Sequence, residues 1–324
     1  MLKIGLIGCG FMGSMHSNCY KNIPDVKVVA FADIRREKAE ALACGTDAAI
    51  YESGKELIAR ADVDIIDICL PTYLHAEHAL PAMEKVKYVF VEKPVALTAE
   101  EGRAMIEKSR ETGAQVQVGQ VIRFWDEYVE LKKILESGKY GKVVNANFRR
   151  ISPRPDWGWE DWLLDHRRSG GAAQDLHIHD VDYVLSVFGQ PKEFYSVKNA
   201  IGEKNSYVNT LMQYGDFVVS VEGTWDLPGC YPFTATFRVV TEDAVVENAG
   251  GRFMLYTKDG ASEIKIEKKE LVGGVDSGNI SDLGGYYNEL LYFCDRAKNG
   301  EPIEKATLCD GVSSLEFLMT ELAR

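Results

Sequence analysis

The stretch Leu2-Lys-Ile-Gly-Leu-Ile-Gly8-Cys-Gly10-Phe-Met-Gly13 decides the fold of this chain. An apolar run of strand length leads directly into three glycines spaced as G-x-G-x-x-G, and a helix-like segment follows. In such a unit the first glycine permits the tight turn, the second lets a pyrophosphate approach the backbone, and the third lets the helix pack on the strand. The helix N-terminus offers unpaired N–H groups to the phosphates. The stretch predicts a dinucleotide-binding Rossmann domain with cofactor contacts from Gly8, Gly10, Phe11, Met12 and Gly13.

Asp33 supports this interpretation over the alternative of a glycine-rich turn that binds nothing. It ends the second strand-like run, about 20 residues after Gly13, where a carboxylate binds both hydroxyls of the adenosine ribose. A 2′-phosphate would meet a like charge there, so we expect NAD rather than NADP. Arg35 and Arg36 follow at once and could receive that phosphate, which keeps NADP open; otherwise both lie at a solvated helix start.

The pattern of the whole chain indicates two domains. Up to about residue 120, short apolar runs alternate with amphipathic helical stretches, which is typical of a doubly wound parallel sheet covered on both faces. Thr98 and Glu101 form a capping box at the start of one such helix. Beyond that point, alternating segments separated by turns indicate a largely antiparallel sheet. We expect a Rossmann domain over residues 1–121 and an α+β domain for substrate binding and oligomerisation over residues 122–324. The expected strands of the first domain are Lys3–Ile7, Val26–Ala32, Ile65–Cys69, Tyr88–Val91 and Gln115–Val118.

Composition narrows the possible partners. The 324 residues carry a formal net charge of -12, which argues against binding to nucleic acid or an anionic membrane, because both need a concentrated positive surface. The seven cysteines contain no C-x-x-C pair and are expected mostly as buried free thiols. The apolar run at the N-terminus is too short for a signal peptide or a membrane span, so a cytoplasmic protein is expected.

Two segments carry candidate catalytic groups. Glu92-Lys93-Pro94 follows a buried strand-like run, and open α/β sheets bind ligands at that edge. Taken alone, Lys93 would be a surface lysine; its position raises the functional interpretation. On a helix, Asp175, His179 and Asp182 would form one polar stripe, which suits a base with its electrostatic partner. The alternative is a helix whose Asp and His side chains merely cap and solvate it.

The same segment raises the question of a metal site. His177 and His179 are ligand types, but on an α-helix they point about 200° apart, so one ion could not use both. A strand would put them on one face and revive a metal site. We expect no metal.

The combination of Gly8-x-Gly10-x-x-Gly13, Glu92-Lys93-Pro94 and Asp175-x-x-x-His179 resembles the glucose–fructose oxidoreductase/inositol dehydrogenase (Gfo/Idh/MocA) family, in order and spacing over essentially the whole chain. The resemblance implies that Lys93, Asp175 and His179 are catalytic. It further implies that Leu70, Pro71, Thr72 and His75 lie along the nicotinamide side. We also expect cofactor contacts from Arg35, Glu92 and Lys93. The family usually has Gly-Lys-His-Val before the Glu-Lys-Pro strand, where this chain has Lys85-Val-Lys-Tyr-Val.

The resemblance implies hydride transfer between nicotinamide and a CH–OH carbon of a sugar or cyclic polyol, and we take inositols as the first candidates. His179 would accept the hydroxyl proton, Lys93 would donate to the alcohol oxygen, and Asp175 would orient the pair. Arg123 could reach a substrate hydroxyl or form a structural salt bridge. Trp162, with Trp157 and Trp159, could stack on a sugar or pack at a domain interface.

Two other functions stay open. One is an NAD-dependent glycosidase, and the other is a dinucleotide-binding sensor without turnover. The exposed sheet of the second domain and the family resemblance favour a homo-oligomer, either a dimer or a tetramer.

Overall fold

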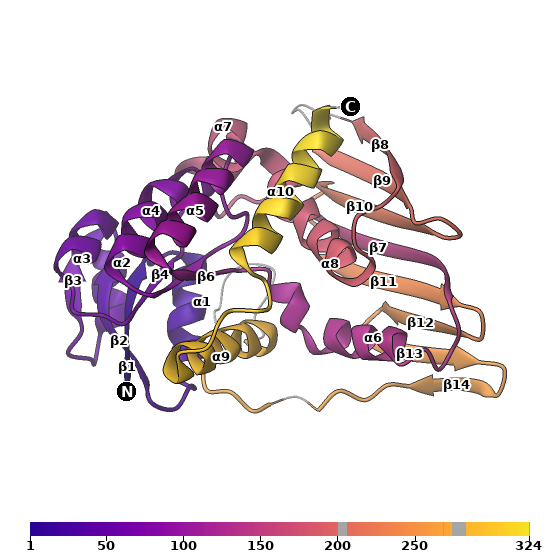
Figure 1. The fold of residues 1–324 in the computed structure, drawn as a ribbon, viewed down its shortest axis with the longest axis horizontal. Helices are drawn as coiled ribbons and strands as arrows, with labels where there is room; N and C mark the ends of the chain where they lie inside the picture. The colour runs from indigo at the N-terminus through magenta and orange to yellow at the C-terminus, as the bar shows by residue number, and fades with distance from the viewer. Residues whose placement is uncertain (200–205, 268, 274–282, 324) are drawn as a thin grey trace. The chain divides into compact units, whose positions relative to one another are not determined.

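The computed structural model describes residues 1–199, 206–267, 269–273 and 283–323 (Figure 1). The chain divides into two compact units. The first contains Met1–Phe124 and Lys269–Ser313; the second contains Trp125–Lys268 and Ser314–Arg324. The first crossing lies close to the expected boundary at residue 121. The division differs from a single boundary, because Lys269–Ser313 returns to the first unit.

The first unit is built on a six-stranded parallel sheet in the order β3-β2-β1-β4-β5-β6. This order reverses direction between β1 and β4, and ligands of open α/β sheets bind beside that reversal, at the carboxyl ends of the strands. Every residue of β4 and β5 is buried, as expected for strands covered on both faces. The strands are β1 (Leu2–Ile7), β2 (Val26–Ala32), β3 (Ala49–Tyr51), β4 (Ile65–Ile68), β5 (Tyr88–Val91) and β6 (Gln115–Val118).

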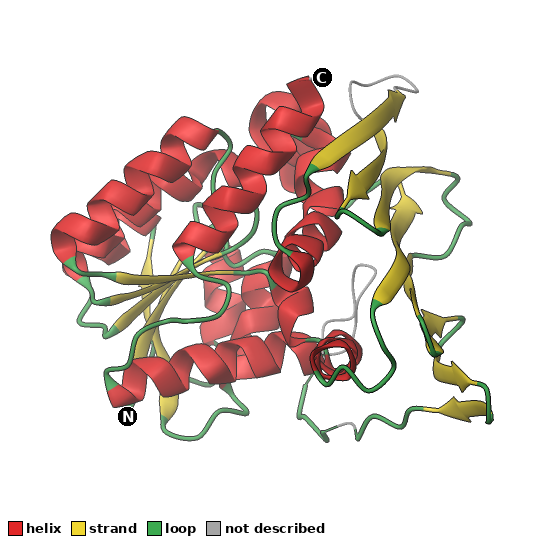
Figure 2. Cartoon of the chain, turned by 45° about the vertical axis from the view of Figure 1, so that its right-hand side comes forward, coloured by secondary structure: helices red, strands yellow, loops and turns green. Residues whose placement is uncertain are grey.

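Helices cover both faces of this sheet (Figure 2). The capping box expected at Thr98 is present at the start of α5: Thr98 Oγ1 accepts from the Glu101 N–H at 3.2 Å, and Glu101 Oε2 accepts from the Thr98 N–H at 3.0 Å. The late helix α9 packs on α1, so the returning segment completes one layer of the first unit. The helices are α1 (Phe11–Tyr20), α2 (Arg36–Ala43), α3 (Gly54–Arg60), η1 (Thr72–Leu74), α4 (His75–Lys85), α5 (Ala99–Thr112), η2 (Val121–Phe124) and α9 (Gly284–Asn299).

The second unit contains an eight-stranded sheet in the order β14-β13-β12-β11-β7-β10-β9-β8. All its pairs are antiparallel except β7 with β10, which run parallel. The sheet is therefore not the simple meander that the alternating pattern predicts. A parallel pair needs a long crossover, and the helical segments between β7 and β8 provide it. The strands are β7 (Val143–Pro153), β8 (Glu193–Asn199), β9 (Tyr207–Gln213), β10 (Val218–Leu227), β11 (Thr234–Thr241), β12 (Ala244–Ala249), β13 (Arg252–Thr257) and β14 (Gly260–Glu263).

The helices of the second unit gather on one face of its sheet (Figure 2). Ile178 and Val181, on the helix expected near residues 171–188, are fully buried, as the apolar pattern predicted. The segment is an α-helix only from Ile178 onward; a π-helical turn occupies Ala173–His177. The helical elements are α6 (Asp126–Glu136), η3 (Trp159–Leu164), α7 (His166–Ser169), η4 (Ala173–His177), α8 (Ile178–Phe188) and the C-terminal part of α10 (Leu308–Ala323).

Candidate functional site

Three glycines shape the turn between β1 and α1, each for a different reason. Gly8 has a φ of +92°, and a Cβ there would collide with the Cys69 carbonyl oxygen. A Cβ on Gly13 would collide with the Gly8 carbonyl oxygen. At Gly10 the nearest atom to an added Cβ is Arg35 Nη2 at 3.9 Å, so Gly10 keeps a space open. The first and third glycines are needed for the fold, and the second leaves room for a ligand.

The N-terminus of α1 faces this space with unsatisfied N–H groups. Gly10 is its N-cap, and no side chain caps the helix. The helix has no acidic residue in its first turn, so nothing of its own neutralises the positive end of the dipole. Together with the gap at Gly10, this end fits a pyrophosphate, with Phe11 and Met12 supplying backbone N–H groups.

Asp33 is held at the end of β2 beside the same turn. Its two carboxylate oxygens accept hydrogen bonds from the backbone N–H groups of Cys9 and Arg35, each at 2.8 Å. The Arg35 guanidinium also contacts this carboxylate, with Nε at 3.3 Å from Asp33 Oδ1. Asp33 is therefore oriented before any ribose binds. Its charge opposes a 2′-phosphate, and Arg35 is already paired with it.

The segment after β4 approaches the loop after β5 through His75. His75 is buried, with Nδ1 at 2.8 Å from the Pro94 carbonyl oxygen and Nε2 at 2.7 Å from the Leu70 carbonyl oxygen. Burial lowers the pKa of His75, against the smaller opposite effect of the two carbonyls. His75 thus joins Leu70-Pro71-Thr72 to the Glu92-Lys93-Pro94 loop. Thr72 is 1% exposed, and its hydroxyl has no partner among the described residues.

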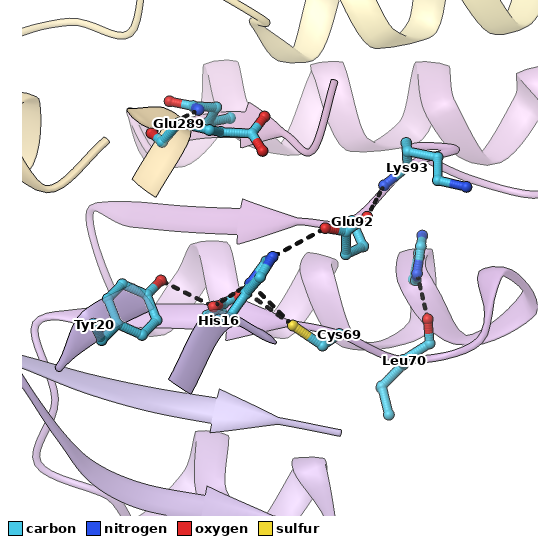
Figure 3. A network of polar contacts seen from close by, with 10 residues as sticks. His16, Tyr20, Cys69, Leu70, Glu92, Lys93 and Glu289 are labelled. Atoms are coloured by element: carbon cyan, nitrogen blue, oxygen red, sulfur yellow. Dashed lines mark hydrogen bonds and ion pairs between the residues drawn. The ribbon is translucent and has the colours of Figure 1, made fainter. Parts of the chain in front are cut away.

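Lys93 follows β5 at the carboxyl edge of the sheet, as the sequence predicted. Its backbone N–H donates to Glu92 Oε2 at 3.0 Å (Figure 3). The Glu92 side chain is buried and turns back toward the sheet, where Oε1 lies 3.1 Å from His16 Nε2. The backbone at Lys93 is therefore held by the buried side chain of Glu92.

A buried polar cluster surrounds His16 beneath this loop (Figure 3). His16 Nδ1 lies 2.8 Å from Asp67 Oδ2 and 3.2 Å from Cys69 Sγ. The Tyr20 hydroxyl donates to Asp67 Oδ2 at 2.9 Å. His16, Asp67 and Cys69 form the single group of close metal-ligand types found among the described residues. Their hydrogen bonds to one another account for the cluster without an ion.

Asp175 and His179 lie in the second unit, on two kinds of helix. Asp175 is part of the π-helical turn η4 and is half-buried, whereas His179 lies in the first turn of α8 and is 8% exposed. Asp182 does not continue an exposed polar stripe: it is fully buried and accepts from the Ser314 hydroxyl at 2.8 Å. The π-helical turn also means that the spacing of an uninterrupted α-helix does not apply between Asp175 and His179.

His177 serves a structural contact in the same unit. It is fully buried, and its Nε2 lies 3.2 Å from Glu321 Oε1 near the end of α10. Glu321 Oε1 also accepts from the hydroxyls of Ser196 and Thr210. The segment is helical, so the strand that would revive a metal site at His177 and His179 is not formed.

The weaker candidates have the following surroundings. Arg123 Nη1 lies 3.2 Å from Asp310 Oδ2 within the first unit, which is the salt bridge expected as the alternative to a substrate contact. Trp162 packs against a buried cluster that includes Leu163 and Trp225. Trp157 is 43% exposed.

Comparison with known proteins decides the family. Residues 2–120 match the model described as "Oxidoreductase family, NAD-binding Rossmann fold", and residues 128–247 match the "GFO/IDH/MocA C-terminal domain". The chain belongs to the Gfo/Idh/MocA family. The predicted family, the fold class and the NAD-binding Rossmann fold are thereby confirmed.

Curated relatives in this family act on polyols and sugars according to their names. Inositol 2-dehydrogenase of Rhizobium meliloti (strain 1021) is 30% identical over 222 residues, which are 65% of this chain and 65% of that protein. D-glucoside 3-dehydrogenase of Escherichia coli (strain K12) is 27% identical over 232 residues, which are 71% of this chain and 63% of that protein. The chain thus spans less than two thirds of the length of these relatives.

Solved structures show that the fold extends over the whole chain. The crystal structure of an oxidoreductase from Agrobacterium radiobacter in complex with NAD+, L-tartaric acid and magnesium has a TM-score of 0.86 at 18% identity. The match covers 100% of this chain and 96% of that one.

In this Gfo/Idh/MocA member, no helix within the described ranges is long and apolar enough to cross a membrane. None of the seven cysteines forms a disulfide, and four are buried.

Two polar residues of the first unit were missed by sequence reasoning. His16 stands three residues after Gly13 on α1, and a histidine inside a Rossmann helix gave no signal of its contacts. Gln120 follows β6 at the same sheet edge where Lys93 follows β5. It is fully buried, and both polar atoms of its side-chain amide have no partner among the described residues. Its place after a strand end was the available signal.

Proposed function

We propose that this Gfo/Idh/MocA chain is an NAD(P)-dependent dehydrogenase that moves a hydride between nicotinamide and a secondary CH–OH carbon of a sugar or cyclic polyol. One observation carries the proposal: the glycine turn after β1 and Lys93 after β5 lie at the same carboxyl edge of one parallel sheet, and the glycine turn lies at its topological switch point. The names of the inositol and glucoside dehydrogenases among the relatives support the substrate class.

The residues of this chain would share the work as follows. The glycine turn and the free end of α1 hold the pyrophosphate, and Asp33 orients the ribose. Lys93 donates to the alcohol oxygen and stabilises the negative charge that develops there. The His179 imidazole accepts the hydroxyl proton, because a histidine titrates close to neutral pH. Asp175 favours the charged forms of this pair. The bound nicotinamide supplies the carbon that accepts the hydride.

A panel of substrates with matched variants tests the proposal. Inositols, hexoses, uronates and amino sugars are offered with NAD and with NADP, and the appearance of reduced cofactor is followed by absorbance. With the substrate that turns over best, we expect Lys93→Ala and His179→Ala each to lower kcat by about 10²- to 10⁴-fold. NADH affinity, measured by fluorescence titration, should change less than about threefold in both variants, because neither group belongs to the pyrophosphate or ribose site.

Lys87→Ala is the matched control, since Lys87 is an exposed lysine at the opposite end of the same strand. Its turnover should equal that of the unmodified chain. Wild-type kcat in both Lys93→Ala and His179→Ala would rule out the proposed roles. Release of free sugar from glycosides without accumulating NADH would identify a glycosidase, and NADH binding without turnover on any substrate would identify a sensor.

We also propose that the chain forms a homo-oligomer through the face of the eight-stranded sheet opposite its helices. Tyr195 and Leu211 are paired across β8 and β9 and are 69% and 49% exposed; Val197 on β8 is 55% exposed. Exposed apolar side chains gathered on one sheet face are typical of a subunit contact. The molar mass measured by light scattering after gel filtration tests this, and a monomer at micromolar concentration would contradict it.

A further inference from the structure

His16 connects two parts of the first unit that the proposed function treats separately. It lies in the second turn of α1, the helix that begins at the glycine turn, and its side chain is fully buried. Its Nδ1 contacts Asp67 on β4, and its Nε2 lies 3.1 Å from Glu92 Oε1. Glu92 in turn accepts from the backbone N–H of Lys93 at 3.0 Å. The His16 side chain thus links α1 to Glu92, which accepts the hydrogen bond from the Lys93 backbone (Figure 3).

The charges in this chain of contacts favour a protonated His16. Nδ1 is hydrogen-bonded to Asp67, whereas Nε2 lies 3.1 Å from Glu92 Oε1 without a hydrogen bond among the described residues, and a proton on Nε2 would make this contact an ion pair. Burial by itself lowers the pKa of His16, but Cys69 and Asp67 raise it by more, so it lies well above the usual value. Cys19 and Tyr20 on α1 also face this cluster, as do Glu289 and Cys294 on α9. His16 therefore lies between two buried carboxyl side chains, Asp67 and Glu92.

The Glu92 side chain has little freedom to move away from this position. Gly119, directly after β6, leaves the space that the carboxylate fills: a Cβ there would lie 2.9 Å from Glu92 Cδ. The backbone N–H of Glu92 is bonded to the Ile68 carbonyl oxygen at 3.0 Å. Buried opposite charges at short distance tolerate separation poorly, because each would be left uncompensated in a low-dielectric interior. A shift of α1 at His16 is therefore transmitted to Glu92.

We propose that His16 is a positioning residue that couples occupation of the glycine turn to the placement of Lys93. Phosphate binding at the N-terminus of α1 fixes that helix, His16 carries the constraint to Glu92, and Glu92 holds the N–H of Lys93. The proposal rests on the proposed function, in which the turn binds a dinucleotide and Lys93 contacts substrate. It adds that the two sites are linked before the nicotinamide itself touches the lysine loop.

Hydrogen exchange of single backbone amides tests this link directly. The probe is ADP-ribose, which carries the pyrophosphate and both riboses but no nicotinamide, so it cannot act on Lys93 by direct contact of that ring. The reporter is the Lys93 amide, and the neighbouring Glu92 amide, bonded to a main-chain carbonyl, is the internal reference. In the unmodified chain we expect ADP-ribose to slow exchange at Lys93 by about tenfold, with a smaller change at Glu92.

His16→Gln removes the charge while keeping a polar side chain of similar reach. In this variant, exchange at Lys93 should be about tenfold faster without ligand, and ADP-ribose should no longer slow it. ADP-ribose affinity itself should change less than about threefold, since His16 does not face the ligand space. With the best substrate of the panel, kcat should fall by about 10- to 100-fold while KM for NAD stays within about twofold.

Tyr20→Phe is the matched control. Tyr20 bonds the same Asp67 oxygen from the same helix but does not contact Glu92, so it removes a buried hydrogen bond of the cluster without interrupting the connection. If His16 served only the packing of the core, both variants would behave alike in exchange and in kcat. We expect Tyr20→Phe to keep the response of Lys93 to ADP-ribose.

A second variant keeps the test decisive if His16→Gln does not fold. Gly119→Ala adds one methyl group against the Glu92 carboxylate from the opposite side, at a backbone conformation open to alanine. It should likewise remove the response at Lys93 while ADP-ribose still binds. An unchanged Lys93 response in either folded variant would overturn the coupling. Failure of ADP-ribose to bind the unmodified chain would instead overturn the proposed function, so the two failures are distinguishable.

Discussion

The loop that carries Lys93 and the helix that carries His179 are held in place by different kinds of charge. Beneath Lys93, the buried basic group is the imidazole of His16, which lies between Asp67 and Glu92 and whose charge depends on pH. Beside His179, the buried cation is Arg150, whose Nε lies 2.8 Å from Asp180 Oδ2. An arginine side chain keeps its charge throughout the pH range in which proteins are folded. The charge beneath Lys93 can thus change with pH, whereas the Arg150 guanidinium beside His179 keeps its charge.

The surroundings of the two proposed catalytic groups, Lys93 and His179, are therefore expected to respond to different changes. A change of pH acts on His16 beneath Lys93 and leaves the charge of Arg150, beside His179, as it was. The ion pair between Arg150 and Asp180 is best tested by a substitution. The predictions below separate the two units on this basis.

The largest effect is expected from Asp180→Asn in the second unit. Asp180 and Arg150 are 0% and 2% exposed, and the Tyr128 hydroxyl, 3.2 Å from Arg150 Nη2, cannot replace the lost charge. A buried guanidinium without its anion costs about 3–5 kcal/mol of unfolding free energy. Urea unfolding at neutral pH measures the loss. The exposed Asp216→Asn in the same unit should change stability by less than about 0.5 kcal/mol. A loss below about 1 kcal/mol in Asp180→Asn would show that Arg150 finds other compensation.

How far each unit could be predicted from sequence follows the same division. In the first unit, the succession of strands and helices, the glycine turn, Asp33 and the capping box at Thr98 all have local signals: a period, a spacing or a cap. The three-residue strand β3 (Ala49–Tyr51) is too short to show a period, and it was missed.

The features that could not be predicted depend on distant parts of the chain. Strand β7 pairs in parallel with β10 about 70 residues later, and no local pattern encodes such a partner. The contacts of His16 with Asp67 and Glu92 join residues of three elements, and only the fold brings them together. The π-helical turn at Ala173–His177 interrupts a segment whose apolar spacing indicates a regular α-helix. Side-chain burial of Gln120 likewise depends on the packed interior rather than on its neighbours in sequence.

A second, smaller effect is expected from Gly10→Ala, which separates ligand binding from the charged cluster of the first unit. An added Cβ at Gly10 meets nothing closer than 3.9 Å, so stability should fall by less than about 1 kcal/mol. The methyl group would occupy the space left for the pyrophosphate. We expect NADH affinity, measured by fluorescence titration, to fall by about 30-fold, equivalent to about 2 kcal/mol.

Gly13→Ala is the contrasting variant, because its Cβ would collide with the Gly8 carbonyl oxygen. Gly13→Ala should lower the free energy of unfolding and not only the affinity for NADH. If Gly10→Ala bound NADH as tightly as the unmodified chain, the glycine turn would not be the pyrophosphate site.

The smallest effect is the dependence of stability on pH that His16 contributes in the first unit. The pKa of His16 is raised in the folded chain, so below its unfolded value of about 6.5 both states carry the proton and the stabilisation is complete. Above that pH the unfolded chain releases the proton first, and the stabilisation is lost until the pH passes the folded pKa. His75 acts in the opposite direction: burial lowers its pKa, so its effect is a loss of stability as the pH falls below about 6.5.

The window above about pH 6.5 therefore isolates His16. From there to about pH 8.5, we expect the unfolding free energy of the unmodified chain to fall relative to that of His16→Gln, with a slope of up to about 1.4 kcal/mol per pH unit. The deficit of Asp180→Asn should stay constant over the same range, because Arg150 does not titrate there. A constant difference between the unmodified chain and His16→Gln would mean that His16 is neutral in the folded state. Its contact with Glu92 would then carry no charge, and the contrast between the two units would disappear.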